Sequence, residues 1–153
     1  MSDTSALIVD GLVQHSLSLT STDFGRYPAE AQIADVSQLA PKREGRGVKL
    51  GALLATAKPL PEARFITLHS SDGTFSASIE RAEIEHRALL IYQQQDGTPV
   101  PGSAGGPIRF VIPNFNDPCA NVRGLGRIEL SATPGRDTRP SLTQIQIKKK
   151  EHS

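Results

Sequence analysis

The sequence of 153 residues predicts a single α+β domain of short strands and short helices. Short runs of β-branched and apolar residues recur along the chain and are separated by Gly, Pro and Asp, as in β-rich domains. One stretch, "ARFITLHSSDGTFSASIE" (63–80), consists of two such runs joined by Ser-Ser-Asp-Gly, which predicts a β-hairpin. Residues 48–57 instead carry apolar residues near helical spacing and predict a helix.

The N-terminal part of the domain predicts two strands and a short helix. Residues 6–14, "ALIVDGLVQ", are short and β-branched, and the Asp-Gly pair inside them indicates a tight turn or a bulge. Residues 15–24 alternate polar and apolar side chains and then offer Thr, Ser and Thr as helix N-caps. We therefore expect a strand followed by a short helix that ends near Gly25.

The middle of the chain gives a weaker pattern. Residues 29–39 fit either a strand or a helix, whereas Pro41 and the segment "KREGRG" (42–47) predict a loop. The helix predicted over 48–57 must end before "KPLP", because two prolines cannot continue it.

Three more strands are predicted in the C-terminal half. A helical turn beginning at residue 81 precedes a strand over 88–93, which ends at an Asp-Gly turn. Residues 106–113 predict a strand bounded by prolines at end positions, where a missing amide is tolerated. Residues 122–132 predict a strand that two glycines break.

The pattern weakens after residue 132, so we place the domain at 6–132 and a C-terminal extension at 133–153. The "QIQI" stretch of this extension predicts an edge strand before a charged tail.

Charge and composition exclude several classes of partner. A net charge of +1 gives no electrostatic reason to expect nucleic acid or an anionic membrane surface as a partner. The single cysteine, Cys119, excludes a disulfide within the chain and a Cys-rich zinc site. With no secretory signal and no apolar run of membrane-spanning length in the printed sequence, we expect a cytoplasmic protein.

The order of the motifs is more specific than any one of them. It runs "GVKLGALLATA" (47–57), the Asp-Gly hairpin, "ALLIY" (88–92), "GGPIRFVIP" (105–113) and "NVRGLGRIEL" (121–130). This order resembles the oxidoreductase molybdopterin-binding domain, the catalytic fold of the sulfite oxidase family. That family has a Gly-Val-x-Leu helix start, an Asp-Gly hairpin, an Ala-Leu-Leu strand, a Gly-x-Pro-Leu-Arg strand, and Val-Lys-Trp before an Ile-Glu-Leu strand.

The resemblance implies a curved, largely antiparallel sheet that carries one pyranopterin dithiolene with molybdenum, held by a cysteine thiolate. It also implies oxygen-atom or electron transfer to a small substrate at the metal. Backbone amides and Arg, Lys and His side chains would hold the phosphate and the ring of the pterin. The cofactor-binding residues that it implies in this chain are Arg109, Arg123, His69, Asp72 and Arg46.

Two arginines carry most of this expectation. Arg109 matches the arginine at the cofactor end of the Gly-x-Pro-x-Arg strand, where a guanidinium can give bidentate hydrogen bonds to a phosphate or an oxyanion. The alternative is that Arg109 pairs with a nearby carboxylate. Arg123 occupies the Lys position of Val-Lys-Trp and keeps its charge. His69 either donates to a pterin or substrate oxygen, or ends the hairpin strand exposed to water.

Three positions depart from the family pattern. Asp35, or alternatively Ala34, stands where the metal-ligand cysteine is expected, Ala104 replaces a histidine, and Gly124 replaces the tryptophan. The weak candidates for a metal ligand are therefore the Asp35 carboxylate and the Cys119 thiol. Their alternatives are an Asp that caps a turn or a helix, and a small buried cysteine with no role.

Two functions from different classes remain. One is a small molybdopterin-dependent oxidoreductase with an altered metal shell that binds a pterin cofactor or an oxyanion; the missing cysteine counts against bound molybdenum. The other is a cofactor-free binding or interaction module on the same scaffold, whose partner is a small anion, a pterin-like molecule or a protein. In both, a pocket for an anion is favoured by the cations that the chain keeps, namely Lys42, Arg43, Arg46, Arg109 and Arg123.

Overall fold

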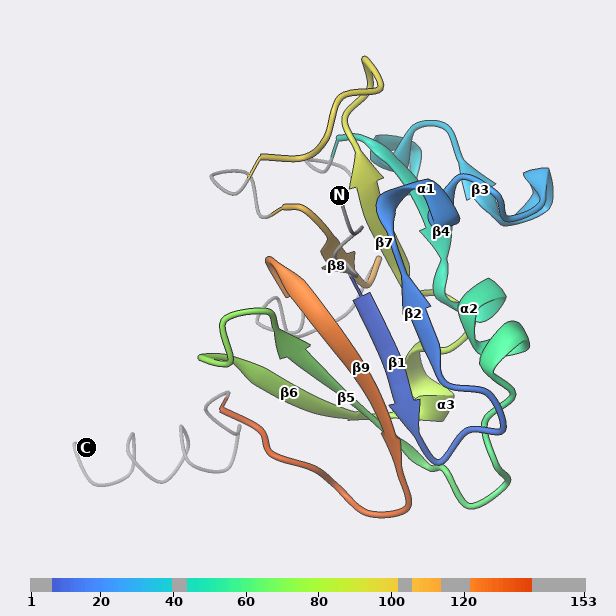
Figure 1. The fold of residues 1–153 in the computed structure, drawn as a ribbon, viewed down its shortest axis with the longest axis vertical. Helices are drawn as coiled ribbons and strands as arrows, with labels where there is room; N and C mark the ends of the chain where they lie inside the picture. The colour runs from blue at the N-terminus through green and yellow to red at the C-terminus, as the bar shows by residue number, and fades with distance from the viewer. Residues whose placement is uncertain (1–6, 40–43, 102–105, 114–121, 139–153) are drawn as a thin grey trace, which may run out of the picture.

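The fold consists of short strands and still shorter helices (Figure 1). The structure is a computed structural model of the chain, and it describes residues 7–39, 44–101, 106–113 and 122–138. The strands are β1 (Leu7–Gly11), β2 (Leu17–Leu19), β3 (Gln32–Ile33), β4 (Arg46–Lys49), β5 (Phe65–Ser70), β6 (Ser76–Glu80), β7 (Leu89–Gln93), β8 (Arg109–Val111) and β9 (Leu125–Ser131). The helices are α1 (Ser21–Phe24), α2 (Leu50–Ala57) and α3 (Arg81–Ile84), with 3₁₀ turns η1 (Ala29–Ala31) and η2 (Val36–Gln38).

The strands form two sheets. One has the order β2-β1-β9-β5-β6 and the other the order β3-β4-β7-β8. Every pairing is antiparallel except that of β1 with β9, which is parallel. The predicted α+β fold with a mixed, largely antiparallel sheet is therefore confirmed.

The five-stranded sheet buries one face and leaves much of the other to solvent, as alternating strands require. In β1, Leu7 and Val9 are fully buried, whereas Ile8 between them is 42% exposed. The predicted hairpin is confirmed, because β5 pairs with β6 from Phe65 opposite Glu80 to His69 opposite Ser76.

The four-stranded sheet is buried on both faces, which explains the unbroken apolar run of β7. Leu90 of β7 belongs to the main core, whereas its neighbours Leu89 and Ile91 belong to a second cluster on the opposite face. The other members of this second cluster are Ile33, Val36, Val100 and Val111.

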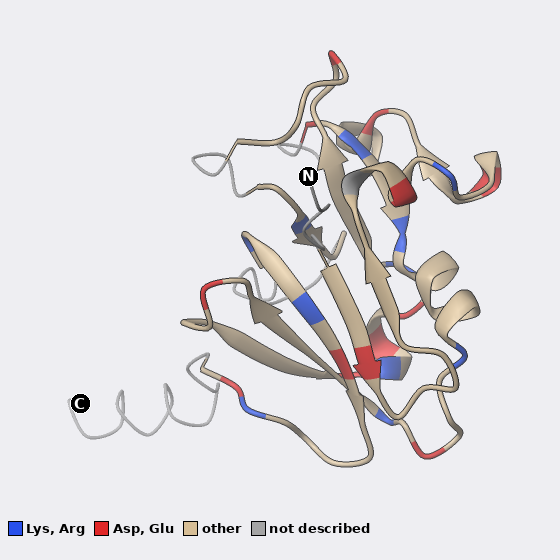
Figure 2. Cartoon of the chain, in the orientation of Figure 1, with Lys and Arg blue, Asp and Glu red and all other residues tan. Residues whose placement is uncertain are grey.

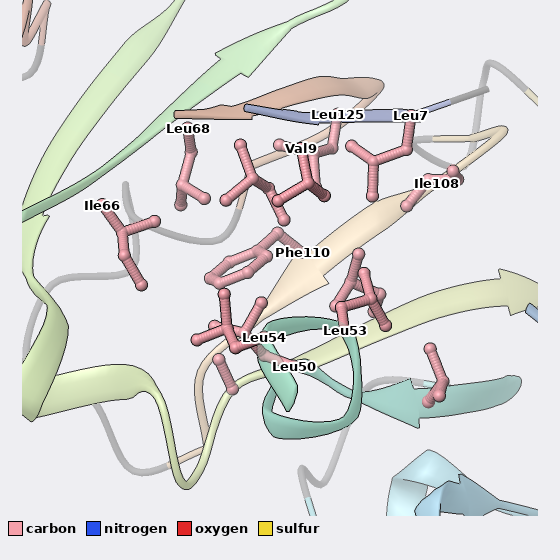
Figure 3. Close-up of a cluster of buried hydrophobic side chains, with 14 of the residues drawn as sticks. Leu7, Val9, Leu50, Leu53, Leu54, Ile66, Leu68, Ile108, Phe110 and Leu125 are labelled. Carbon is pink, nitrogen blue, oxygen red and sulfur yellow. The ribbon is translucent and has the colours of Figure 1, made fainter. Parts of the chain in front are cut away.

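The main core lies between the two sheets and is closed by α2 (Figure 3). Phe110 of β8 occupies its centre, with Val9 and Leu68 of the five-stranded sheet on one side and Leu50 and Leu54 of α2 on the other. Helix α2 can fill this place because its apolar residues recur every three or four positions, so one face of the helix turns inward.

Two local expectations are wrong. The segment "KREGRG" (42–47) was expected to be a loop, yet its last two residues begin β4, and α2 begins only at Leu50. Strand β4 is held by hydrogen bonds to β3 and to β7, and neither partner is visible in the local sequence. Gly126 does not break its strand but lies within β9.

The ambiguous segment 29–39 contains both kinds of structure in short pieces, η1, β3 and η2. The edge strand expected from the "QIQI" stretch lies outside the residues that the structure describes. None of the helices within the described ranges has the length and apolarity to span a bilayer.

Substitutions of Leu7 and Ile8, which are adjacent in β1, can test which face of this strand is buried in the core. Leu7→Ala should lower the free energy of unfolding by about 2–5 kcal/mol, because the side chain is fully buried between the sheets and its removal leaves a cavity. Ile8→Ala, in the same strand but on the exposed face, should lower it by less than about 1 kcal/mol. Urea denaturation followed by circular dichroism measures both, and similar losses in the two variants would contradict the assignment of faces.

Candidate functional site

The two arginines singled out by the sequence lie on segments whose backbones run side by side. Arg109 is the first residue of β8, and Arg123 lies two residues before β9. The segments are joined by two backbone hydrogen bonds of 2.8 Å, from the Phe110 amide to the Val122 carbonyl and from the Leu125 amide to the Ile108 carbonyl. Basic positions accordingly occur on β8 and at the start of β9 (Figure 2). We call this pair, Arg109 and Arg123, the arginine site.

The hairpin turn between β5 and β6 lies directly against the start of β9. The Ser71 amide donates to the Gly124 carbonyl at 2.7 Å. A Cβ on Gly126 would lie 2.7 Å from Cα of Ser71, so only glycine lets the turn come this close. A Cβ on Gly124 would lie 3.7 Å from the Gly106 carbonyl oxygen, which brings a third segment to the same place.

The two guanidinium groups differ in their surroundings. Arg109 is half-buried and pairs across the sheet with Ile91, so it shares a face with the second apolar cluster. Arg123 is exposed. The site therefore joins one cation anchored on an apolar sheet face to one cation that is open to solvent.

Asp72 lies in the exposed hairpin turn beside the arginine site. The Thr74 amide (3.0 Å), the Ser70 hydroxyl (2.7 Å) and the Thr74 hydroxyl (2.7 Å) all donate to its Oδ1. These hydrogen bonds, the Thr74 amide first, lower the pKa of Asp72 from 3.8 to about 2. The carboxylate is thus anionic at neutral pH and already has donors that shape the turn.

His69 belongs to a network of charged groups on the outer face of the five-stranded sheet. Its Nε2 lies 3.0 Å from Oε1 of Glu129. Arg127 joins Glu129 (3.5 Å) to Asp10 (2.8 Å) in the same network, and the hydrogen bond to Asp10 raises the pKa of Arg127. Figure 2 shows these basic and acidic positions together on β9 and β1. His69 therefore ends its strand beside a carboxylate and not simply in water.

Sequence reasoning missed this network because its members lie far apart in the chain. The register places Asp10 opposite Glu129, and Arg127 opposite both His69 and Ile8. The charges themselves were visible in the sequence, but their proximity depends on the pairing of three strands.

Asp35 caps η2. Its Oδ1 accepts the Ser37 amide at 3.0 Å and the Ser37 hydroxyl, and the Gln95 side-chain amide lies 3.4 Å away. The structure therefore shows the capping role that was the alternative to metal ligation. Arg46 is exposed in β4, where it pairs with Gln93 across a bulge.

Asp35 does not converge with the arginine site. Ile33, two residues before it, and Arg109 lie in one row that crosses the four strands of the smaller sheet. Three strand spacings separate the ends of that row by about 14 Å. The structure brings Arg109, Arg123 and Asp72 to one end of the fold and leaves Asp35 at the opposite edge of the sheet.

Four positions singled out in the sequence lie outside the described residues: Lys42, Arg43, Ala104 and Cys119. Within the described ranges, no group of three or more His, Cys, Asp or Glu side chains is placed so that it could hold a metal ion.

An open, mainly apolar hollow of about 440 Å³ lies elsewhere, beside the outward face of α2. Its floor includes the small residues Gly51, Ala52 and Ala55, and its rim includes Glu30, Lys49, Glu85 and His86. None of the predicted site residues within the described ranges lines it. The run of small residues on the outer face of α2 was the only sign of this hollow in the sequence.

Residues 2–138 match the model of the family described as the oxidoreductase molybdopterin binding domain. The chain belongs to this family. The resemblance inferred from the order of the motifs is thereby confirmed.

Two known proteins share parts of this domain. The NADPH-dependent nitrate reductase of Fusarium oxysporum is 33% identical over 73 residues, which cover 44% of this chain and 8% of that enzyme. The sulfane dehydrogenase SoxCD of Paracoccus pantotrophus has the same fold, with a TM-score of 0.66 at 20% identity. That match covers 88% of this chain and 40% of the SoxCD chain, so the chain spans less than half of either protein.

The hydrogen bonds to Asp72 predict how acid affects the hairpin. The folded chain holds this pKa at about 2, below 3.8, so the ionised carboxylate stabilises the fold above about pH 4, and this stabilisation is lost as the pH falls through about 2. Asp72→Asn should therefore be less stable than the native chain at neutral pH and approach it in strong acid.

Urea denaturation from pH 7 down to about pH 2 measures this difference in the free energy of unfolding. Thr74→Val, which removes one of the donors, should show a smaller loss with the same pH dependence. A difference between Asp72→Asn and the native chain that stays constant down to pH 2 would contradict the assignment.

Proposed function

We propose that this domain binds the phosphate of a pterin cofactor, or another oxyanion, at the arginine site, and that its metal shell differs from the thiolate shell that the resemblance implies. The single observation that carries the proposal is the backbone pairing of residues 108–110 with residues 122–125, which holds the two arginine-bearing segments together.

Two cations on adjacent segments favour an anion for a physical reason. Arginines on segments that run side by side can both give charge-assisted hydrogen bonds to one anion. Guanidinium is suited to this role because its planar donors match the oxygens of phosphate and because it stays protonated. The nearby Asp72 carboxylate already accepts hydrogen bonds from its own turn.

The residue at the expected ligand position does not fit a molybdenum–thiolate centre. Asp35 offers a carboxylate oxygen, a harder ligand than the sulfur that suits this metal. Ligation through Oδ1 would also compete with the donors that this atom accepts at the start of η2. We therefore assign the arginine site to the phosphate end of the cofactor and derive no redox step at Asp35.

The capping role of Asp35 favours a second candidate, a cofactor-free binding or interaction module on this scaffold. An Asp that serves as a cap has a structural reason to be present without any metal. In that case the ligand of the arginine site is a small anion, a pterin-like molecule or an acidic group on a protein partner.

The two proposed functions can be distinguished by the pterin and molybdenum content of the protein. The chain is expressed in a host that makes the pterin cofactor and is fed molybdate. We expect pterin, measured by fluorescence after release, with clearly less molybdenum by elemental analysis. Near-stoichiometric molybdenum together with pterin would favour an active oxidoreductase in which another residue replaces the thiolate. Folded protein that contains neither would favour the interaction module.

The contribution of Arg109 can be measured separately. Arg109→Ala should weaken the binding of inorganic phosphate by a few kcal/mol, the scale of a charge-assisted hydrogen-bond pair. Arg64→Ala is the matched control, because this exposed arginine precedes β5 at the end of that strand far from the hairpin turn. Isothermal titration calorimetry measures both, and equal affinities in the two variants would count against the arginine site.

A further inference from the structure

We propose that the edge of β6 is a surface on which a second copy of this chain can pair, and that residues 135–138 cover this edge in the single chain. We call residues 135–138 the latch. Strand β6 is the last strand of the five-stranded sheet, so one side of its backbone has no neighbouring strand among the described residues. Figure 1 shows the chain leaving the end of β9 and returning toward β6.

The latch is bound to the free side of β6 mainly by side chains. The Ser78 amide donates to Oδ2 of Asp137 at 3.0 Å. The Ser76 amide donates to the Thr138 hydroxyl at 3.1 Å, and the Thr138 amide returns a backbone hydrogen bond of 2.8 Å to the Ser76 carbonyl. A carboxylate and a hydroxyl of the latch therefore accept from amides that the carbonyls of a neighbouring strand would otherwise satisfy.

The latch also covers small polar side chains on the outer face of the sheet. Thr67 of β5 and Ser76 of β6 are buried there, although neither belongs to the apolar core. The Gly135 amide donates to the Ser78 hydroxyl at 2.9 Å, and a Cβ on Gly135 would collide with the Thr67 side chain. The Ser76 hydroxyl is buried without a hydrogen-bond partner among the described residues, so the closed latch leaves this polar group unsatisfied.

The backbone of β6 suits antiparallel pairing with an identical strand. Backbone groups alternate sides along a strand, so Ser76, Ser78 and Glu80 direct theirs to the free side. The hydrogen bonds of the Ser76 and Ser78 amides to the latch agree with this alternation. A two-fold axis at Ser78 would place this residue opposite its own copy and Ser76 opposite Glu80 of the second copy.

The side chains are complementary in this register. Residues directly opposite each other lie on the same face of a sheet, so Ser76 would meet Glu80 of the second copy at both ends of the pair. Glu80 is exposed, and its carboxylate can accept from the Ser76 hydroxyl that the latch leaves unsatisfied. Glu80 is the only charged residue of β6, so no like charges of the two strands would face each other. These features favour a second copy as the occupant of the edge.

The test measures self-association of the whole chain by analytical ultracentrifugation over a series of protein concentrations. The double variant Asp137→Ala/Thr138→Val removes the two side-chain acceptors of the latch. Arg136→Ala is the matched control, because this exposed residue lies in the same segment and makes none of the hydrogen bonds to β6 described above. A triple variant adds Ser78→Lys to the double variant, which would place two lysines opposite each other at the two-fold axis.

We expect the double variant to dimerise with at least about tenfold higher affinity than the native chain, because the edge can pair only in molecules whose latch is open. Arg136→Ala should associate no more strongly than the native chain. The triple variant should associate no more strongly than the native chain either, because like charges oppose the pairing. Circular dichroism shows whether each variant is folded.

Three results would overturn the proposal. The first is a folded double variant that associates no more strongly than the native chain, whether both are monomers or both are dimers. The second is a dimer that persists in the triple variant, since it would form at another surface. The third is an equal gain in affinity in Arg136→Ala. Should the double variant fail to fold, Asp137→Ala alone takes its place, with a smaller gain in affinity that Ser78→Lys again abolishes.

Discussion

The fold depends on the point where its two sheets are joined by backbone. Strand β8 is an edge of the four-stranded sheet, and the segment entering β9 leads into the middle of the five-stranded one. The hydrogen bonds of Phe110 to Val122 and of Leu125 to Ile108 connect them. The residues that make these bonds also bury their side chains in the core between the sheets, so the packing of the core fixes the geometry of the site.

This coupling holds the segments that carry Arg109 and Arg123 side by side. Separation of Arg109 from Arg123 would require breaking backbone bonds whose donors and acceptors belong to buried residues, and unpaired buried groups are costly. Under the proposed function, this rigid frame would need little rearrangement to bind an anion.

Sequence reasoning succeeded for elements that a local sequence pattern specifies. It failed for features that depend on the pairing of strands distant in the chain. The hairpin, β1 and the body of α2 follow from alternation, turn residues and helical spacing within one stretch. The start of β4 and the network of His69, Glu129 and Arg127 depend on strands that are distant in the chain. The family could be predicted because the order of its motifs is visible in the sequence, whereas the distance between Asp35 and Arg109 depends on the order of the strands in the sheet.

Phosphate recognition and metal ligation place different chemical requirements on this domain. Phosphate recognition needs charge and donors on a rigid frame, and the joined backbones provide that frame whatever stands at position 35. The thiolate ligation that the resemblance implies needs a soft sulfur, whereas Asp35, one of the two residues matched to that position, is a carboxylate that caps η2. Asp35 follows β3 and Arg109 lies on β8, and these strands are the opposite edges of the smaller sheet. Under the proposed function, this domain would therefore differ in its metal shell and still hold the anionic end of a cofactor.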